Sequence, residues 1–168
     1  MYETNRLILR KAVFSDWEQM YRNIWCHKET ARYMLWAVTE SEAAAKERME
    51  RTIAFQQSHH AWLVVEKESG KAIGFAGLRE ESGVCEDTGI AVGPRYVGKG
   101  YGTEILNELV RIAKEGLNAH GFIATCRSEN EASRKMILGC GFRFSHAEPR
   151  VDKRNGEKYT LEFYRKEL

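Results

Sequence analysis

The stretch Gly93–Gly102 contains the residue types with which proteins bind phosphate groups. Three of its glycines stand at alternate positions, and glycine accepts positive φ angles and lets the backbone approach a ligand closely. A long amphipathic helix follows, whose first N–H groups have no intrahelical acceptor and whose N-terminus carries a partial positive charge. We therefore interpret the stretch as a backbone cradle for a phosphorylated ligand, with the cations Arg95 and Lys99 nearby.

Two nucleotide-binding motifs fit these glycines less well. A Walker A loop matches from Gly93 to Lys99, but the next residue is Gly100, where the motif needs a Ser or Thr that holds Mg²⁺. A dinucleotide-binding turn needs a different glycine spacing and an acid at the end of the next strand, where this chain has Arg127. A glycine-rich turn without any ligand is the structural alternative.

Periodic patterns predict the elements that would position this loop. Apolar segments separated by turn residues predict a meander of three antiparallel strands, at 61–66, 72–78 and 85–92. The helix after the loop covers about 103–118, with Gly121 as its C-terminal cap, and a strand at 122–126 follows. Strand, helix and strand form a βαβ unit, so its two strands should be parallel with a right-handed connection.

The segment before the meander predicts a strand at 4–10 and two helices. Ser15 followed three residues later by Glu18 forms a capping box at the start of the first helix. The second helix, from about 39 to 57, carries many charges, which indicates a face open to solvent.

The segment after the βαβ unit predicts one more helix and a hairpin. The helix covers about 131–138 and is capped by Asn130 or Ser128. Asn155-Gly156 suits a type I′ turn between the last two strands. The basic residues around this turn are expected to be solvated: Arg150, Lys153, Arg154 and Lys158.

Length and composition indicate a soluble globular protein. The 168 residues suffice for a substantial core, so we expect a single domain over 1–168. The net charge of +2 gives no electrostatic reason to expect nucleic acid as a partner. No apolar run approaches the ~20 residues of a membrane span. The first residues lack a signal-peptide pattern, so we expect no membrane partner and a cytoplasmic location.

The cysteines and histidines indicate neither disulfides nor a metal site. The four cysteines are widely spaced and form no Cys-x-x-Cys pair, which favours reduced thiols. Cys126 and Cys140 lie in apolar surroundings, where cysteine is more often a small core residue than a nucleophile. His59-His60 has no matching cluster of acids or cysteines, so we expect no metal.

Two motifs together resemble one known superfamily. Arg95-x-x-Gly98-x-Gly100, placed between a strand and a helix, resembles the pyrophosphate loop of the GNAT acetyltransferases. Asn130-x-x-Ser133, followed by a Gly-Phe pair, resembles the second cofactor-contacting motif of that superfamily. The order of predicted elements also follows the superfamily, over nearly the whole chain.

A third motif resembles one branch of this superfamily. Arg32-Tyr33-Met34-x-Trp36, followed by an acidic helix, is similar to the enzymes that acetylate the N-termini of ribosomal proteins, the RimJ/RimL-like branch. This motif is less specific than the loop. An amino acid, a polyamine or an antibiotic amine as acceptor would need the same base and the same cleft.

The resemblance implies the fold, the cofactor and the reaction. We expect a mixed α/β fold, in which an antiparallel meander joins a βαβ unit with splayed central strands and helices on both faces. Acetyl-CoA would donate its acetyl group directly to a primary amine, on a protein N-terminus or a small molecule, without a metal or a covalent enzyme intermediate. A homodimer is one possible assembly.

The resemblance also implies which residues bind acetyl-CoA. The pantetheine arm would pair with the strand ahead of the loop, and the pyrophosphate would bind the loop amides, while Arg95 and Lys99 contact phosphate or remain solvated. Arg134 and Lys135 are weaker candidates for the phosphates. The residues expected to contact the cofactor are Ile90, Ala91, Val92, Arg95, Val97, Gly98, Lys99, Gly100, Tyr101, Gly102, Asn130 and Ser133.

Acetyl transfer needs a base, because an alkyl ammonium with a pKa of about 10 is no nucleophile. Adjacent residues of a strand face opposite sides, so only one of Asp87 and Glu86 should face the cleft. Its position in the family motif favours Asp87 as the base. A chain of water molecules that removes the proton is the alternative. Asn130 would assist turnover. A backbone N–H of the splayed strand would stabilise the oxyanion.

The sequence indicates the general acid less clearly than the base. Many GNAT enzymes carry a Tyr acid at the position of Ile137, so Ser133 is the replacement candidate for protonating the departing thiolate. Alternatively Ser133 is a first-turn helix residue with a local backbone bond. Tyr33 and Trp36 either line the acceptor pocket or pack in the core. A non-catalytic acyl-CoA-binding module and, more distantly, a P-loop-like nucleotide binder remain as alternative functions.

Overall fold

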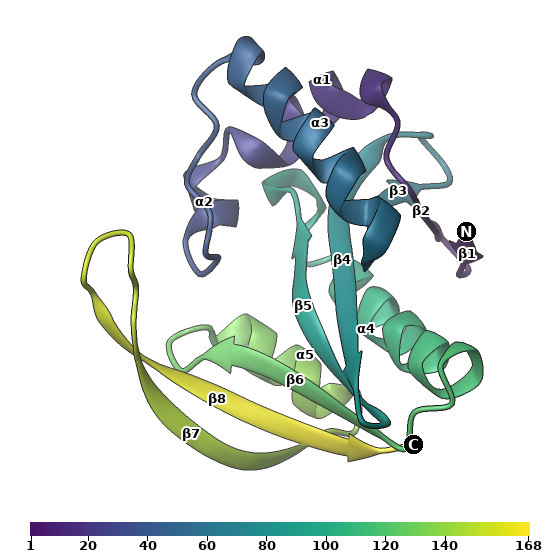
Figure 1. Cartoon of the computed structure of the whole chain (residues 1–168), viewed down its shortest axis with the longest axis vertical. Helices are drawn as coiled ribbons and strands as arrows, with labels where there is room; N and C mark the ends of the chain where they lie inside the picture. Colours follow the sequence, from purple (N-terminus) through teal and green to yellow (C-terminus); the bar gives the residue numbers. More distant parts are fainter.

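The computed structural model describes residues 1–168, and its centre is one eight-stranded mixed sheet (Figure 1). The strand order is β1-β2-β3-β4-β5-β6-β8-β7, and only the pair β5 and β6 is parallel. The strands are β1 (Tyr2–Glu3), β2 (Leu7–Arg10), β3 (His60–Glu66), β4 (Ala72–Glu81), β5 (Val84–Val92), β6 (Gly121–Arg127), β7 (Arg143–Val151) and β8 (Lys158–Glu167).

Helices cover both faces of the sheet. The α-helices are α1 (Trp17–Met20), α2 (Lys28–Ala31), α3 (Glu42–Ser58), α4 (Tyr101–Arg111) and α5 (Glu131–Gly139). Short 3₁₀ turns cover Phe14–Asp16 and Pro94–Tyr96, and π-helical turns, Tyr21–Trp25 and Ile112–Gly116, extend α1 and α4. No helix combines the length and the apolar composition of a membrane span.

Two separate cores form because alternate residues of a strand face opposite sides. Val64 of β3 belongs to the larger core, together with Ile105 of α4 and Ile137 of α5. Its neighbour Leu63 belongs to the smaller core, together with Met49 of α3 and residues of α1. The predicted mixed α/β architecture with helices on both faces is therefore confirmed.

The meander and the βαβ unit are also confirmed. β3, β4 and β5 are consecutive antiparallel neighbours, and α4 connects the parallel strands β5 and β6. The register of β4 against β5 shifts after Gly77, so that Thr88 is an extra residue between Asp87 and Gly89. Gly89 has a φ of 128°, which its lack of a side chain permits. This β-bulge bends β5 where it leaves β6.

The residues that cap the N-termini of the helices agree only partly with those predicted from the sequence. Ser41 caps α3 by accepting from the N–H of Ala44, and Asn130 caps α5. The expected Ser15 cap is wrong. The first turn begins after Val13, whose N–H donates to the carboxylate of Asp16, and an ion pair with Arg10 holds that carboxylate. A buried acid with these partners outcompetes a serine hydroxyl as the capping group.

Two turns differ from the expectations. Gly121 is the first residue of β6 rather than a helix cap, because Asn118 takes the left-handed conformation (φ 53°) that ends the helical segment. The turn between β7 and β8 is not type I′, since Asn155 lacks the positive φ that this turn requires and only Gly156 has it. The first strand is also shorter than expected, because Thr4 and Leu7 bond each other in a turn between β1 and β2.

Gly93 gives a test of how β5 packs at its end. A Cβ added there would lie 2.0 Å from the carbonyl oxygen of Asn23, which belongs to the backbone. We expect Gly93→Ala to lower the free energy of unfolding by about 1–3 kcal/mol, as overpacking does. Urea denaturation measures this change.

The matched control is Gly139→Ala at the end of α5, where a Cβ would meet nothing within 4 Å. This control should leave stability unchanged or raise it slightly, since alanine favours the helix. Equal stability of the two variants would contradict the close backbone contact at Gly93.

Candidate active site

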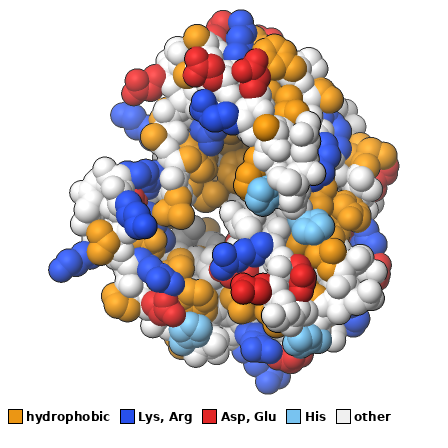
Figure 2. All heavy atoms as spheres, viewed as in Figure 1, with side chains coloured by type: hydrophobic (Ala, Val, Ile, Leu, Met, Phe, Trp, Pro, Cys, Tyr) orange, Lys and Arg blue, Asp and Glu red, His pale blue; other side chains and the backbone are white.

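The strands β5 and β6 separate at the centre of the sheet (Figure 1). Their backbones pair only where Val84–Glu86 lies against Gly121–Ile123. Beyond this point a cleft of about 430 Å³ opens, and Figure 2 shows a hollow beside the β7–β8 hairpin with hydrophobic side chains on its wall. Alternate backbone groups of β5 face away from β4 and have no strand partner along the cleft. An extended ligand can pair with them.

Asp87 lies where the two strands part. Its carboxylate accepts a hydrogen bond from the N–H of Thr125 on β6, at 2.8 Å. Asp87 is one residue and Thr125 two residues beyond the last backbone pair, Glu86 and Ile123. Burial in the cleft raises the pKa of Asp87 to about 7, and the nearby charge of Glu86 also raises it, although the hydrogen bond from Thr125 opposes the shift. A carboxyl group with this pKa exchanges protons near neutral pH, as a general base must.

The glycine loop has the geometry of an anion cradle. Gly98 and Gly100 have φ angles of 76° and 79°, in the left-handed region that other residues rarely adopt. A Cβ at Gly98 would meet nothing within 4 Å, so the backbone conformation, not crowding, requires glycine there. The N–H groups from Val97 to Gly102 donate to no backbone carbonyl. They lie at the start of α4, whose dipole favours an anion.

The N-terminal segment holds this loop in place. Glu104 of α4 accepts hydrogen bonds from the hydroxyl of Thr4, at 2.5 Å, and from the backbone N–H of Arg6, at 2.8 Å. The guanidinium of Arg6 pairs with the same carboxylate and donates to the carbonyl of Lys99 at 2.9 Å. It also stacks on the ring of Tyr101, whose hydroxyl donates to buried Glu66. Sequence reasoning missed this clamp, because its members lie about 100 residues apart.

Asn130 and Ser133 both line the cleft. The side-chain oxygen of Asn130 accepts from the backbone N–H of Ser133 at 3.2 Å, which is the helix-cap bond of α5. The local backbone bond considered for Ser133 therefore exists, but it uses the N–H, while the hydroxyl faces the thiol of Cys126 in the cleft. The amide nitrogen of Asn130 remains available as a donor toward the cleft.

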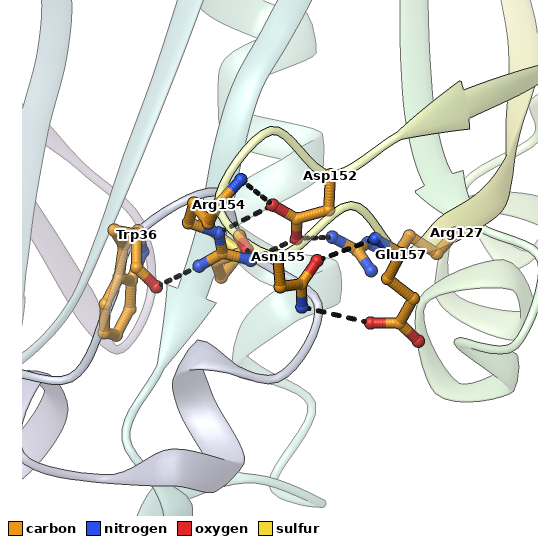
Figure 3. Close-up of polar contacts among 7 residues, drawn as sticks. Trp36, Arg127, Asp152, Arg154, Asn155 and Glu157 are labelled. Atoms are coloured by element: carbon orange, nitrogen blue, oxygen red, sulfur yellow. Dashed lines mark hydrogen bonds and ion pairs between the residues drawn. The ribbon is translucent and has the colours of Figure 1, made fainter.

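Tyr33 and Trp36 lie in the segment between α2 and α3 and also line the cleft. Arg154, in the β7–β8 turn, donates to the carbonyl oxygens of Trp36 and Met34, at 2.6 and 2.8 Å (Figure 3). The same guanidinium pairs with buried Asp152. The hairpin, which curls toward α2 in Figure 1, thus fixes this wall of the cleft.

Arg154 is exposed, as expected, but its guanidinium also has protein partners, and the reason is the burial of Asp152. A buried carboxylate needs charged or hydrogen-bonding partners, and Asp152 receives them from Arg154 and from Arg127 at the end of β6. Hydrogen bonds from Arg154 hold the pKa of Asp152 well below its ordinary value. Arg127 in turn stacks on the ring of Tyr159.

The remaining candidates are placed as follows. Ile90 lines the cleft, while Ala91 and Val92 carry β5 on toward the loop. The side chains of Arg95 and Lys99 are exposed on the loop. Arg134 is not available for a phosphate, because it pairs with Glu162 and donates to the carbonyl of Ser128.

The three buried cysteines do not provide a nucleophile. Cys85, Cys126 and Cys140 are buried. Burial raises the pKa of each thiol, to about 11 for Cys126, which lines the cleft. Because the thiolate is the reactive form, these residues are unreactive near neutral pH.

A second, larger cavity of about 830 Å³ adjoins the cleft. Four residues line both spaces: Trp36, Phe75, Thr88 and Gly89. The bulge of β5 therefore stands between the two cavities, next to Asp87. Two ligands that enter from the two sides would meet at this point.

Comparison with known proteins agrees with this geometry. The profile of the acetyltransferase (GNAT) domain family matches residues 6–143. The chain belongs to the GNAT acetyltransferase family. It is thus an acyltransferase, and the predicted GNAT fold is confirmed. A curated relative, the uncharacterized N-acetyltransferase p20 of Bacillus licheniformis, is 26% identical over 145 residues, which cover 83% of this chain and 80% of the relative.

Solved structures share the GNAT fold. A proposed ribosomal-protein-serine acetyltransferase from Vibrio cholerae has a TM-score of 0.79 at 22% identity, with 99% of this chain and 96% of that chain covered. The microcin C7 self-immunity acetyltransferase MccE, solved with acetyl-CoA and AMP, has a TM-score of 0.82 at 18% identity, with 98% and 94% covered.

The residues of this GNAT acetyltransferase fit acetyl-CoA. The loop amides of Val97–Gly102 have no backbone acceptor and suit a pyrophosphate, and the unpaired side of β5 suits an extended chain. The cleft between them is lined mainly by hydrophobic residues. The loop amides, the unpaired side of β5 and the hydrophobic cleft together form one continuous path from the loop to Asp87.

Glu104 provides a test of the clamp on the loop. We expect Glu104→Gln to weaken acetyl-CoA binding about tenfold, because the amide cannot pair with the guanidinium of Arg6 and the loop loses its anchor. Isothermal titration calorimetry measures this affinity. Circular dichroism should show an unchanged fold.

The control is Glu115→Gln, which removes an exposed partner of Arg111 near the end of the same helical segment. This variant should bind acetyl-CoA as the parent protein does, since surface ion pairs contribute little. Equal affinities for both variants would show that the clamp does not shape the cradle.

Proposed function

We propose that this GNAT acetyltransferase transfers the acetyl group of acetyl-CoA directly to a primary amine in the space between the two cavities. The observation that carries the proposal is the position of Asp87, whose pKa is raised to about 7 where β5 and β6 part. The cradle lies at one end of the cleft and the larger cavity opens beside the bulge. Donor and acceptor therefore have separate entrances and one meeting point.

The chain's own groups hold the cofactor in this proposal. Bound acetyl-CoA supplies the acetyl group as an activated thioester. The loop amides and the dipole of α4 bind phosphate, and β5 offers backbone groups to the pantetheine arm. The binding residues are Ile90, Ala91, Val92, Val97, Gly98, Lys99, Gly100, Tyr101 and Gly102, with Arg95, Asn130 and Ser133 at the margins.

Asp87 acts as the base. Its carboxylate removes a proton from the acceptor ammonium, directly or through water, and leaves the amine lone pair free to attack. The N–H of Thr125 orients the carboxylate through the 2.8 Å hydrogen bond. Glu86 is less suited to this task because its carboxylate pairs with Arg79.

Ser133 and Asn130 act on the opposite side of the cleft. The hydroxyl of Ser133 is free of the cap bond and can give a proton to the departing thiolate sulfur. The amide of Asn130 can donate to a carbonyl of the bound cofactor. Both roles are supported by the position of these side chains in the lining of the cleft.

For the acceptor, a protein N-terminus, as in the RimJ/RimL-like branch, is one of two candidates. The motif around Tyr33 and Trp36 supports it, and these residues do line the cleft. The Vibrio cholerae structure that is described as a ribosomal-protein-serine acetyltransferase is another support. At 22% identity, however, that likeness carries the fold alone, so a small-molecule amine fits the proposal equally.

A thiol-release assay tests the proposed function. The purified protein is mixed with acetyl-CoA and a panel of peptides, amino acids, polyamines and aminoglycosides. Release of CoA with one acceptor class supports the transferase and identifies the class. Tight binding of acetyl-CoA without release for any acceptor would instead support a non-catalytic acyl-CoA-binding module, and Mg²⁺-dependent ATP binding would support a nucleotide site.

The pH profile tests the role of Asp87. Because the base works in its ionised form and its pKa is raised to about 7, kcat/KM should rise with pH through that value and then level off. Asp87→Asn keeps an oxygen that can accept from Thr125, so the fold should persist. We expect this variant to lose about 10²–10⁴-fold in kcat/KM and to lose the pH step near 7.

A control at Glu86 completes this test. Glu86→Gln should keep most activity, with the step moved slightly to lower pH, because the negative charge that helps to raise the pKa of Asp87 is removed. If kcat/KM of Asp87→Asn still rose fully with pH near 7, the base would be another group.

A further inference from the structure

The larger cavity contains an arginine without an acidic partner. The side chains of Arg10, Arg127, Arg134 and Arg154 are at most 34% exposed, and each pairs with a carboxylate. Arg48 of α3 is also half-buried, but no carboxylate lies within 4 Å of its guanidinium. Its one hydrogen bond runs to the hydroxyl of Thr39, at 3.0 Å. The guanidinium has five N–H donors, so most of them remain unused.

Aromatic rings hold Arg48 in place. The guanidinium carbon lies 4.6 Å from the ring centroid of Trp25 and 4.3 Å from that of Trp36. These cation–π contacts orient the planar group without neutralising its charge. Burial and the neighbouring charge of Arg51 lower the pKa of Arg48 to about 10, so the side chain remains a cation near neutral pH.

The charges that line this cavity are mainly positive. Arg48 and Arg51 lie along one side, and the acid among the lining residues is Glu40, which is exposed just before α3. A polycation such as a polyamine or an aminoglycoside would meet the unpaired guanidinium of Arg48 here, whereas exposed Arg51 pairs with Glu47 at 3.8 Å. An anion would find an unpaired, pre-oriented guanidinium, which forms bidentate hydrogen bonds with carboxylate and phosphate.

The cavity also limits the size and shape of its ligand. Its volume of about 830 Å³ lies in the range of small-molecule sites. Aromatic side chains form much of its wall, among them Trp25, Trp36, Phe55, Trp62 and Phe75. Such a wall suits a flat, apolar body between the anionic group and the amine.

We propose that the acceptor is a small-molecule amine that also carries a carboxylate or phosphate group, with the anion bound by Arg48 and the amine at the bulge beside Asp87. The proposal rests on the function proposed above and names its substrate class. Thr88 and Gly89 line both cavities, so an amine at that end of the ligand lies next to the acetyl donor. The anion bound at Arg48 sets the orientation of the ligand.

Matched acceptor pairs in the thiol-release assay test this inference. 4-(Aminomethyl)benzoate is compared with benzylamine, and O-phosphoethanolamine with ethanolamine, so that each pair differs only in the anionic group. Spermidine and a short peptide with a free N-terminus complete the panel. We expect about 10- to 100-fold higher kcat/KM for the anionic member of at least one pair, and the preferred pair distinguishes carboxylate from phosphate.

Arg48→Gln links this preference to the proposed subsite. The amide can still donate to Thr39, so the main loss is the charge. The variant should lose the preference for the anionic member and keep its activity with the neutral member and its KM for acetyl-CoA. Arg48→Lys should restore part of the preference. Arg22→Gln, which alters an exposed pair with Glu18 away from the cavity, is the control and should change nothing.

The outcomes separate this inference from the proposed function. Release of CoA with spermidine or with the peptide in preference to every anionic small molecule would overturn the inference and leave the transferase intact. An equal loss for charged and neutral acceptors in Arg48→Gln would also overturn it, and thermal unfolding would show whether the variant folds. Absence of release with every acceptor would overturn the proposed function itself.

Discussion

The structure depends on the point at which β5 and β6 stop pairing. Two parallel strands at the centre of a sheet normally continue their hydrogen bonds, since unpaired buried backbone groups are unfavourable. Here the ladder ends after Glu86, and the carboxylate of Asp87 supplies the next acceptor, to the N–H of Thr125. One side chain thus replaces a strand bond, and the bulge at Thr88 turns β5 away. The cleft, the raised pKa and the meeting point of the cavities all follow from this interruption.

A sheet interrupted at its centre needs support from its ends. On one side, Arg6 and Glu104 connect the N-terminal segment to the loop that begins α4. On the other side, Arg154 and Asp152 connect the β7–β8 turn to the wall that contains Trp36. Both supports combine an ion pair with hydrogen bonds to backbone carbonyls, so they fix main-chain positions as well as side chains. The cleft is therefore bordered by rigid elements, although its floor lacks a continuous ladder.

Local patterns in the sequence predicted the elements that local interactions determine. The meander, the glycine loop and the Asn130 cap depend on neighbouring residues, and the structure has them. The position of Asp87 in the cleft followed from the resemblance. The argument from strand alternation, that only one of Asp87 and Glu86 faces the cleft, was wrong, because both residues line it. Features that depend on distant partners were missed: the Arg6 clamp, the role of Arg154 and the lone charge of Arg48. The bulge had one local signal, a glycine within an otherwise regular strand, which often marks such a site.

The position of β8 has a consequence for how the two ends of the cleft are supported. β8 is the last strand along the chain, yet it lies inside the sheet, between β6 and β7. The turn that precedes it carries Arg154, which reaches back to Met34 and Trp36 over about 120 residues. The wall of the cleft that contains Trp36 therefore has this anchor only when the β7–β8 hairpin is in place. The phosphate cradle is held by Arg6 and Glu104 instead, so damage to the hairpin would disturb that wall and leave the cradle intact.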